Sequence, residues 1–259
     1  DIVVNISVKD DNTIPNSKVK LRDDGEGDLK IWAVPNCLQV ENRYLVSVDI
    51  GGKSTTSDYT VMTVIDRFGM IPTVKGKPKV VARYRGHVRH DKLAWMAAAL
   101  AHYYDDALLV IESNTADREK NNNTEGDHFL TILQEIADYY DNLYQRTSSS
   151  ENVEDNVLAK YGFQTNKLTK QQVIDNLEEF IDDNLYEEPD KEMYHELRIY
   201  ERHDDGSLGN IVGNGNHDDV VMSTGIGLFV SLTDMEKPSW KKAERRSRGG
   251  DGVHTAAKI

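Results

Sequence analysis

Short apolar runs alternate with polar, turn-forming stretches through the first half of the chain. Residues 44–50, 59–65 and 79–84 are runs rich in β-branched side chains, which predicts three strands in an antiparallel meander. Residues 93–104 carry apolar side chains every three or four positions, the period of a helix, and 107–111 form a fourth apolar run. Because a strand, a helix and a strand normally make a crossover, the fourth strand is expected to join a parallel pair.

The second half of the chain is predicted to be mainly helical. The expected elements are a helix over 127–139, a fifth strand over 142–146, a Ser-rich mobile loop over 147–155, a helix from Thr169, a helix over 191–202 and a buried helix over 220–232. Thr169 and Gln172 have the spacing of a capping box. We therefore predict an α/β fold with a mixed five-stranded sheet, three antiparallel strands followed by parallel strands, flanked by helices.

Charge is unevenly distributed along the 259 residues. The formal net charge is −13, and the segment 175–205 contributes −10 of it, with 13 acidic and three basic residues. Overall acidity argues against a nucleic-acid-binding protein, but the rest of the chain is nearly neutral. We therefore expect the acidic segment to lie away from any reactive cleft, or to form a regulatory face toward a partner. The composition divides the chain into an N-terminal linker or peripheral arm (1–40), a globular domain (41–236) and a basic, flexible tail (237–259).

Cysteine content and hydropathy exclude several classes of protein. Cys37 is the only cysteine, which excludes an intrachain disulfide framework and a cysteine-based zinc site. No apolar run approaches the roughly 18 to 20 residues of a membrane span, so we expect no membrane partner and an intracellular location. His87 and His90 have an i, i+3 spacing, but without cysteine partners they do not favour a zinc site.

Four acidic residues stand at the edges of apolar elements. Asp49 ends the first strand, Glu112 directly follows the fourth, and Asp218 and Asp219 open the last buried helix. If the first and fourth strands pair, their ends lie about 5 Å apart, and a helix N-terminus over that edge would complete the cluster. Clustered carboxylates suit Mg²⁺ or Mn²⁺, and two such ions can promote phosphodiester hydrolysis.

Simpler structural interpretations of these acids exist. Asp49 lies just before a Gly-Gly pair and could be a turn residue. Asp218 and Asp219 could simply be a pair of residues that cap the N-terminus of a helix. Glu112 is harder to explain in this way, because Glu is uncommon in strands and turns. The ordered set of positions therefore favours a metal site over three unrelated turns and caps.

The segments that contain these acids resemble the motifs of one known family. They are Val46-Ser-Val-Asp49-Ile-Gly-Gly with Ser57-Asp58-Tyr59-Thr60, then Val110-Ile-Glu112-Ser-Asn114, then His217-Asp218-Asp219-Val-Val-Met-Ser223. In this order they resemble the three motifs of the nuclease domain of tailed-phage terminase large subunits, and the segment 165–181 resembles the connecting segment of that family. The resemblance implies an RNase H-like fold over 41–236, related to RuvC resolvases, and metal-dependent endonuclease activity on double-stranded DNA during genome packaging.

The resemblance also implies roles for the four acids. Asp49 matches the carboxylate that bridges two Mg²⁺ or Mn²⁺ ions, and Glu112 matches the second ligand. The third ligand is Asp218 or Asp219, or both, and the sequence does not decide between them.

Other residues near the motifs are expected to support the reaction. Asp58 matches an auxiliary outer acid, and His217 is expected to contact the scissile phosphate or to orient an acid. Basic residues near motif ends or in loops are candidates for DNA phosphate contacts: Lys53, Arg118, Lys120, Lys167 and Lys170. Taken one at a time, each of these is better explained as a solvated surface charge.

Partners and alternatives complete the sequence-based expectations. The chain contains no G-x-x-x-x-G-K-[ST] motif, so the packaging ATPase domain of the family is expected to be absent from it. The resemblance implies that ATPase domain, the small terminase subunit and the portal protein as partners, in the cytoplasm of a bacterial host. Alternatives are a RuvC-like junction resolvase or other RNase H-like nuclease, and a non-catalytic docking domain of a packaging motor.

Overall fold

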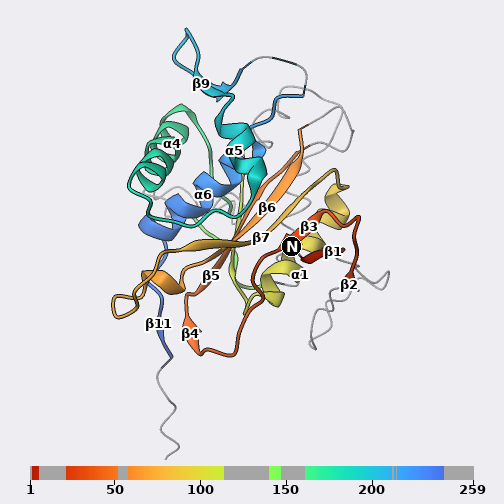
Figure 1. The fold of residues 1–259 in the computed structure, drawn as a ribbon, viewed down its shortest axis with the longest axis vertical. Coiled ribbons are helices and arrows are strands. Elements are labelled where there is room, and N and C mark those ends of the chain that lie inside the picture. Colours follow the sequence, from red (N-terminus) through yellow and green to blue (C-terminus); the bar gives the residue numbers. More distant parts are fainter. Residues whose placement is uncertain are drawn as a thin grey trace, which may run out of the picture.

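One mixed sheet forms the centre of the molecule, and helices cover both of its faces (Figure 1). The structure, a computed structural model, describes residues 2–5, 22–51, 58–113, 140–146, 161–211, 213 and 215–241. The strand order is β2 (Arg22–Asp23), β1 (Ile2–Asn5), β3 (Leu29–Ile31), β7 (Lys79–Gly86), β6 (Thr60–Asp66), β5 (Tyr44–Asp49) and β8 (Leu108–Ile111). The pair β5–β8 is parallel and the other pairs are antiparallel.

The strand pattern confirms the predicted α/β architecture. The first three predicted strands form the antiparallel meander β5–β6–β7. Helix α1 (His90–Tyr103) then connects β7 to β8, which returns to pair in parallel with β5. The predicted crossover therefore joins the first and fourth predicted strands side by side.

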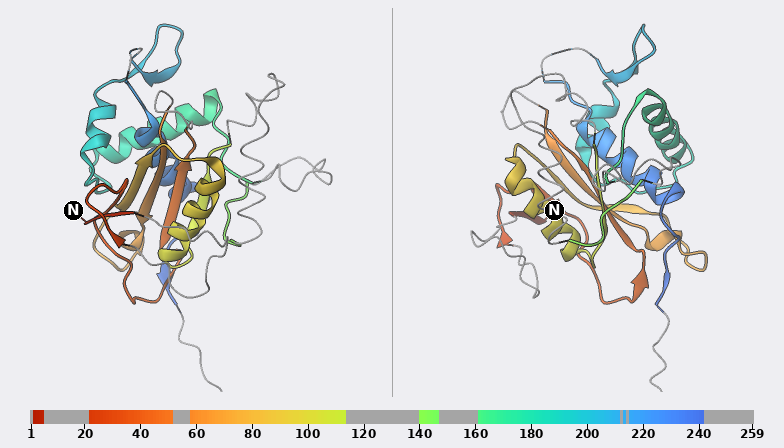
Figure 2. Two further views of the ribbon diagram at one scale, coloured as in Figure 1. Left: turned by 90° about the vertical axis from the view of Figure 1, so that its right-hand side faces the viewer. Right: turned by 180° about the vertical axis from the view of Figure 1, so that it is seen from behind.

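The two faces of the sheet have separate cores because side chains alternate along each strand. On β5, Val46 and Val48 pack with α1, whereas Leu45 packs on the opposite face. That face is covered by α6 (Asp219–Thr233), with α4 (Lys167–Asp182) and α5 (Lys191–Leu197) beside it (Figure 2). A Cβ atom at Gly227 of α6 would lie 2.7 Å from the Ile65 side chain, so glycine allows this helix to pack closely on the sheet.

Helix α6 is fixed at its C-terminal end by a buried arginine. The Arg67 guanidinium donates to the Ser231 carbonyl at 2.8 Å and to the Asn42 carbonyl at 2.6 Å. Burial lowers the pKa of Arg67 to about 10, which still leaves the side chain charged at neutral pH. This charge complements the partial negative charge at the end of a helix.

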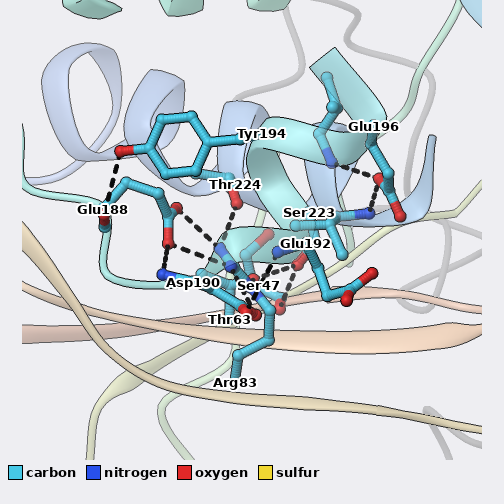
Figure 3. A network of polar contacts seen from close by, with 12 residues as sticks. Ser47, Thr63, Arg83, Glu188, Asp190, Glu192, Tyr194, Glu196, Ser223 and Thr224 are labelled. Atoms are coloured by element: carbon cyan, nitrogen blue, oxygen red, sulfur yellow. Dashed lines mark hydrogen bonds and ion pairs between the residues drawn. The ribbon is translucent and has the colours of Figure 1, made fainter. Parts of the chain in front are cut away.

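A second buried arginine joins the sheet to α5 and α6 (Figure 3). Arg83 of β7 donates to both carboxylate oxygens of Glu188, at 3.1 and 3.0 Å, and to Asp190 at 3.1 Å. Its guanidinium also donates to the Thr224 hydroxyl of α6 at 2.8 Å, and Lys30 of β3 pairs with Asp190. The segment that leads into α5 is therefore anchored to the sheet by charged hydrogen bonds.

The N-terminal region differs from the prediction of an irregular arm over 1–40. Leu29–Ile31 forms β3, which pairs with β7, and both Leu29 and Ile31 are buried. The fifth principal strand is therefore β3 and not 142–146, where Leu143 and Gln145 form only isolated bridges. The prediction failed because β3 has three residues and pairs with a strand about fifty positions away, which no local pattern reveals. The predicted domain boundaries stay a prediction.

The acidic segment also differs from the predicted helix over 191–202. Helix α5 ends at Leu197, and β9 (Tyr200–Arg202) pairs with β10 (Leu208–Asn210) across a turn in which Gly206 has φ +77°. Helix α4 begins two residues before Thr169, because Asn166 is its cap and Thr169 completes the capping box. The predicted helix over 127–139 and the loop over 147–155 lie outside the described residues.

Short elements complete the described part of the chain. Strand β4 (Val40–Glu41) pairs with β11 (Ser239–Trp240), and η1 (Phe68–Met70) is a 3₁₀ turn against which Trp240 packs. The start of the predicted flexible tail is therefore a strand, and residues 242–259 lie outside the described part. None of the described helices has the length and apolar character that crossing a bilayer requires.

Candidate active site

Asp49 and Glu112 lie side by side because strand register puts them at the same level. The parallel pairing of β5 with β8 runs up to Val48, whose carbonyl accepts the Glu112 N–H at 2.9 Å. Asp49 follows the alternation of Leu45, and Glu112 follows that of Val110, so both belong to the face that α6 covers. Two carboxylates from neighbouring strands therefore meet at one edge of the sheet.

The first turn of α6 brings two further acids to this edge. Asp218 is the N-cap residue and Asp219 is the first helical residue. The Asp219 carboxylate accepts the Tyr59 N–H at 3.0 Å, and the Asp218 carboxylate pairs with the Lys170 ammonium of α4 at 3.3 Å. The structure thus brings the acids of all three sequence motifs to one place.

These residues line one cleft with a volume of about 360 Å³. Its walls come from the ends of β5 and β8, the segment before β6, and the N-termini of α4 and α6. The lining residues are Asp49, Ile50, Asp58, Glu112, Thr165, Asn166, Lys167, Lys170, Asp218, Asp219 and Met222. No residue of the acidic segment 175–205 is among them, although Asp205 lines an adjoining hollow together with Lys167 and Lys170.

Two acids of the cleft, Asp49 and Asp219, have raised pKa values. Burial raises the pKa of Asp49 well above its usual range, and the carboxylates of Glu112, Asp219 and Asp218 raise it further. Burial also raises the pKa of Asp219 to about 7, against the opposing effect of the Tyr59 N–H. A cluster of carboxylates that repel one another in a confined space is the donor set that hard divalent cations prefer, so these residues fit Mg²⁺ or Mn²⁺.

Gly51 allows the segment after β5 to pack closely against the backbone of Asp58 and Tyr59, just before β6. A Cβ atom at this position would lie 2.3 Å from the Asp58 carbonyl oxygen, so a larger residue would push the two segments apart. The Gly51 N–H donates to the Thr60 hydroxyl at 3.1 Å. This close contact explains why position 51, two residues after Asp49, is glycine. It also positions the Tyr59 N–H that donates to Asp219.

Asp58 and His217 lie at the outer side of the cleft. One ligand atom each of Asp58, His217 and Asp219 lies within 4.8 Å of the other two. His217 Nδ1 is 3.4 Å from Asp58 and 3.7 Å from Asp219. Asp58 is largely exposed, whereas Asp219 is buried. The predicted auxiliary residues therefore share the neighbourhood of Asp219, and their roles stay predictions.

Two of the five predicted DNA contacts fall in the described part of the cleft. Lys167 and Lys170 both line it, from the first turn of α4. Lys170 is paired with Asp218, so it is less available to a phosphate than the exposed Lys167. The other three, Lys53, Arg118 and Lys120, lie outside the described residues.

Several residues beside the acids were missed by the sequence analysis. The Arg85 guanidinium stacks over the Tyr59 ring at 3.7 Å, and the His87 ring stacks on the same tyrosine at 4.3 Å. Glu196 of α5 is 4% exposed and accepts hydrogen bonds from the N-terminus of α6. Its spacing of three from the apolar Met193 placed it on the buried side of α5, and this was the available signal.

Comparison with known proteins supports the fold. Neither a protein-family model nor a curated protein sequence matches the chain. The structure resembles the magnesium-bound large terminase nuclease of thermophilic phage G20c, with a TM-score of 0.52, 17% identity and coverage of 88% of this chain and 91% of that one. The cobalt-bound form gives the same values, and a third structure of that nuclease gives a TM-score of 0.51 at 19% identity, covering 87% and 91%. The predicted α/β fold is confirmed, and it is similar to the fold of that terminase nuclease.

Proposed function

We propose that the chain is a metal-dependent endonuclease that hydrolyses double-stranded DNA during viral genome packaging, as the nuclease domain of a terminase large subunit. One observation carries this proposal: four carboxylates from three separate elements line a single cleft. The resemblance of the fold to a magnesium-bound terminase nuclease supports the same activity.

Each acid has a distinct part in this proposal. Asp49 is the natural bridging ligand, because its pKa responds to all three of the other carboxylates. Glu112 would hold one ion with Asp49, and Asp218 and Asp219 would hold the second from the helix side. Bound Mg²⁺ or Mn²⁺ would supply an activated water and offset the charge that develops on the leaving oxygen.

The proposed substrate is the sugar-phosphate backbone of duplex DNA. Lys167 is exposed at the mouth of the cleft and is suited to a phosphate contact. Lys170 would be released toward the substrate when a cation takes its place beside Asp218. Backbone contacts carry little sequence information, so cleavage should be weakly sequence-specific and binding should weaken with salt.

The proposed setting follows from the same activity. A terminase nuclease works beside a packaging ATPase domain, the small terminase subunit and a portal protein in the cytoplasm of an infected bacterium. The exposed acids of α4, such as Asp182, are unsuited to DNA and would face solvent or one of these partners.

Plasmid cleavage tests the proposal. With Mn²⁺ or Mg²⁺ the protein should nick and linearise supercoiled plasmid, and chelation with EDTA should stop the reaction. Asp49→Ala should lower the rate by at least about a hundredfold, because it removes the carboxylate shared by both ions. Asp182→Asn removes an exposed acid of α4 and should cleave at the wild-type rate.

Other outcomes would contradict the proposal in distinct ways. Cleavage that survives Asp49→Ala would overturn the assignment of the cleft. A strong preference for four-way junctions over plasmid duplex would favour a resolvase. Absence of both cleavage and Mn²⁺ binding would favour a non-catalytic docking domain.

A further inference from the structure

The N-terminus of α6 is capped by a residue from another helix. One Glu196 carboxylate oxygen accepts the Val220 N–H at 2.7 Å and the Val221 N–H at 3.1 Å (Figure 3). Val220 and Val221 occupy the second and third helical positions, whose N–H groups the side chain of the N-cap residue ordinarily satisfies. Glu196, a residue of α5, therefore caps α6, whereas the N-cap residue Asp218 would ordinarily do so.

The Asp218 side chain does not cap α6. Its side chain makes no capping hydrogen bond, although Asp is among the best N-cap residues. Its backbone, at φ −126° and ψ 13°, departs from the extended conformation typical of an N-cap. Its carboxylate lines the cleft instead, with the Lys170 ammonium 3.3 Å away.

We propose that Glu196 is a positioning residue that caps α6 in place of Asp218 and so keeps the Asp218 carboxylate available to the metal site. This inference rests on the proposed function, because it assigns Asp218 a task in the cleft. Glu196 does not line the cleft itself, so it acts through α6 and not on the substrate.

Competition for the same two N–H groups is the physical basis of the inference. Val220 and Val221 are buried, and a buried N–H donor that loses its partner destabilises the fold. Without Glu196, the nearest acceptor by position is the side chain of Asp218, the N-cap residue. The Asp218 carboxylate would then accept these N–H groups and would no longer point into the cleft.

Glu196 is also well placed to hold Asp219. Its second carboxylate oxygen lies 3.8 Å from the Arg85 guanidinium, which stacks on Tyr59. The backbone N–H of that tyrosine binds the Asp219 carboxylate at 3.0 Å. One buried carboxylate therefore supports both acids of the α6 motif, through the helix N-terminus and through an arginine–tyrosine stack.

Helix α5 provides a fixed base for this contact. Asp190 caps α5 by accepting the Glu192 N–H at 3.3 Å and is paired with the buried Arg83. The position of Glu196 is thus set by the sheet, independently of whether the cleft is occupied.

Direct Mn²⁺ binding, measured by titration calorimetry with Mn²⁺ alone, tests the proposal in the whole chain. Glu196→Ala should weaken Mn²⁺ binding about ten- to a hundredfold, the usual cost of losing a group that orients metal ligands. Glu196→Gln keeps an oxygen acceptor at the same reach and should stay within about threefold of wild type. Val230→Ala removes a buried side chain near the other end of α6, so it should lower Tm but leave Mn²⁺ affinity unchanged.

Equal weakening by Glu196→Ala and Val230→Ala would overturn the proposal, because general destabilisation would then explain both. Wild-type Mn²⁺ affinity in Glu196→Ala would overturn it as well. If Glu196→Ala does not fold, Glu196→Asp supplies the same comparison, because its carboxylate is one methylene too short to reach both N–H groups.

A crystal structure of metal-free Glu196→Ala separates this inference from the proposed function. The Asp218 carboxylate should turn to accept the Val220 and Val221 N–H groups. If it stays in the cleft, the capping inference is wrong whatever the protein cleaves. If it turns but wild-type protein binds no Mn²⁺ and cleaves no DNA, the proposed function fails and only the capping exchange stands.

Discussion

Asp219 carries a carboxylate that folding places among like charges. Its pKa rises to about 7, from an ordinary value of 3.8, mainly through burial, with Asp58 and Asp218 adding to the rise and Arg85 opposing it. His217 Nδ1, 3.7 Å away, and the buried Asp49 and Glu196 are further titratable groups near it. The folded protein therefore binds a proton that the unfolded chain releases near pH 4.

This shift predicts how metal-free stability depends on pH. The stabilisation from the Asp219 proton is complete below about pH 4 and is lost as pH rises through about 7. Asp219→Asn, which needs no proton, should therefore be more stable than wild type at pH 8 by about 2 to 4 kcal/mol. Urea unfolding in EDTA between pH 4 and 8 measures this difference.

The same comparison at pH 4 is the control, because protonated Asp219 and asparagine should then be nearly equivalent. Asp49 also has a raised pKa, so the variant should flatten the pH profile only in part. A variant that is less stable than wild type at pH 8 would contradict the burial of an acid at this position.

The four acids of the cleft could be predicted at residue scale because each stands where a pattern breaks. Asp49 and Glu112 end apolar runs, and Asp218 precedes one. Their roles as ligands stay predictions. Glu196 could not be singled out, because it lies among 13 acids in 175–205 and its burial depends on how α5 packs against α6. Only Met193 on the same helix face hinted at it.

At the scale of elements, a buried arginine connects three parts of the fold. Arg83 satisfies Glu188 and Asp190, whose side chains are each 3% exposed. Burial disfavours the arginine charge, but these two carboxylates raise its pKa above the usual value. Removal of the arginine therefore leaves buried Glu188 without its ion pair and buried Asp190 paired only with Lys30.

Arg83→Met should destabilise the protein by about 3 to 5 kcal/mol, the usual cost of breaking a buried ion pair. Lys30→Met is the matched control, because Lys30 binds the same Asp190 from a position 41% exposed and should cost less than about 1 kcal/mol. Equilibrium unfolding in urea measures both variants. Similar small losses in both would mean that water compensates the carboxylates when Arg83 is absent.

Elements with strong local patterns were predictable, and elements defined by distant pairing were not. The runs at β5, β6 and β8 and the apolar helix α6 have nearly the predicted limits. By contrast, β3 and the β9–β10 hairpin have only three residues in each strand, and they exist because a partner strand supplies their hydrogen bonds. Short strands of this kind carry no periodic signal of their own.

At the scale of the whole molecule, acidic residues form two groups, one on the exposed surface of α4 and one in the cleft. Exposed acids such as Glu178, Glu179 and Asp182 account for much of the charge of α4, and none of them lines the cleft. Cations that occupy the cleft would relieve repulsion among its own acids without changing the surface of α4. Metal binding should therefore stabilise the whole fold.

Mn²⁺ at about a hundred times its dissociation constant should add about 2.7 kcal/mol of stability and raise Tm by about 5 to 10 °C. Thermal unfolding with increasing Mn²⁺ measures the shift. Asp49→Ala should remove most of it, whereas Asp182→Asn should not. An equal shift in both variants would mean that Mn²⁺ binds the acidic surface and not the cleft.

The parallel register of β5 with β8 determines which residues of the two strands reach the cleft. Asp49 and Glu112 reach the cleft because each directly follows the last pair of the parallel register, Val48 with Ile111. Each also lies an even number of residues from a side chain on the α6 face. One residue inserted within either strand would turn its acid toward α1. Loops can therefore vary in length over evolution, whereas these strands cannot. A chain can share only 17% of its residues with the G20c nuclease and still have a similar fold.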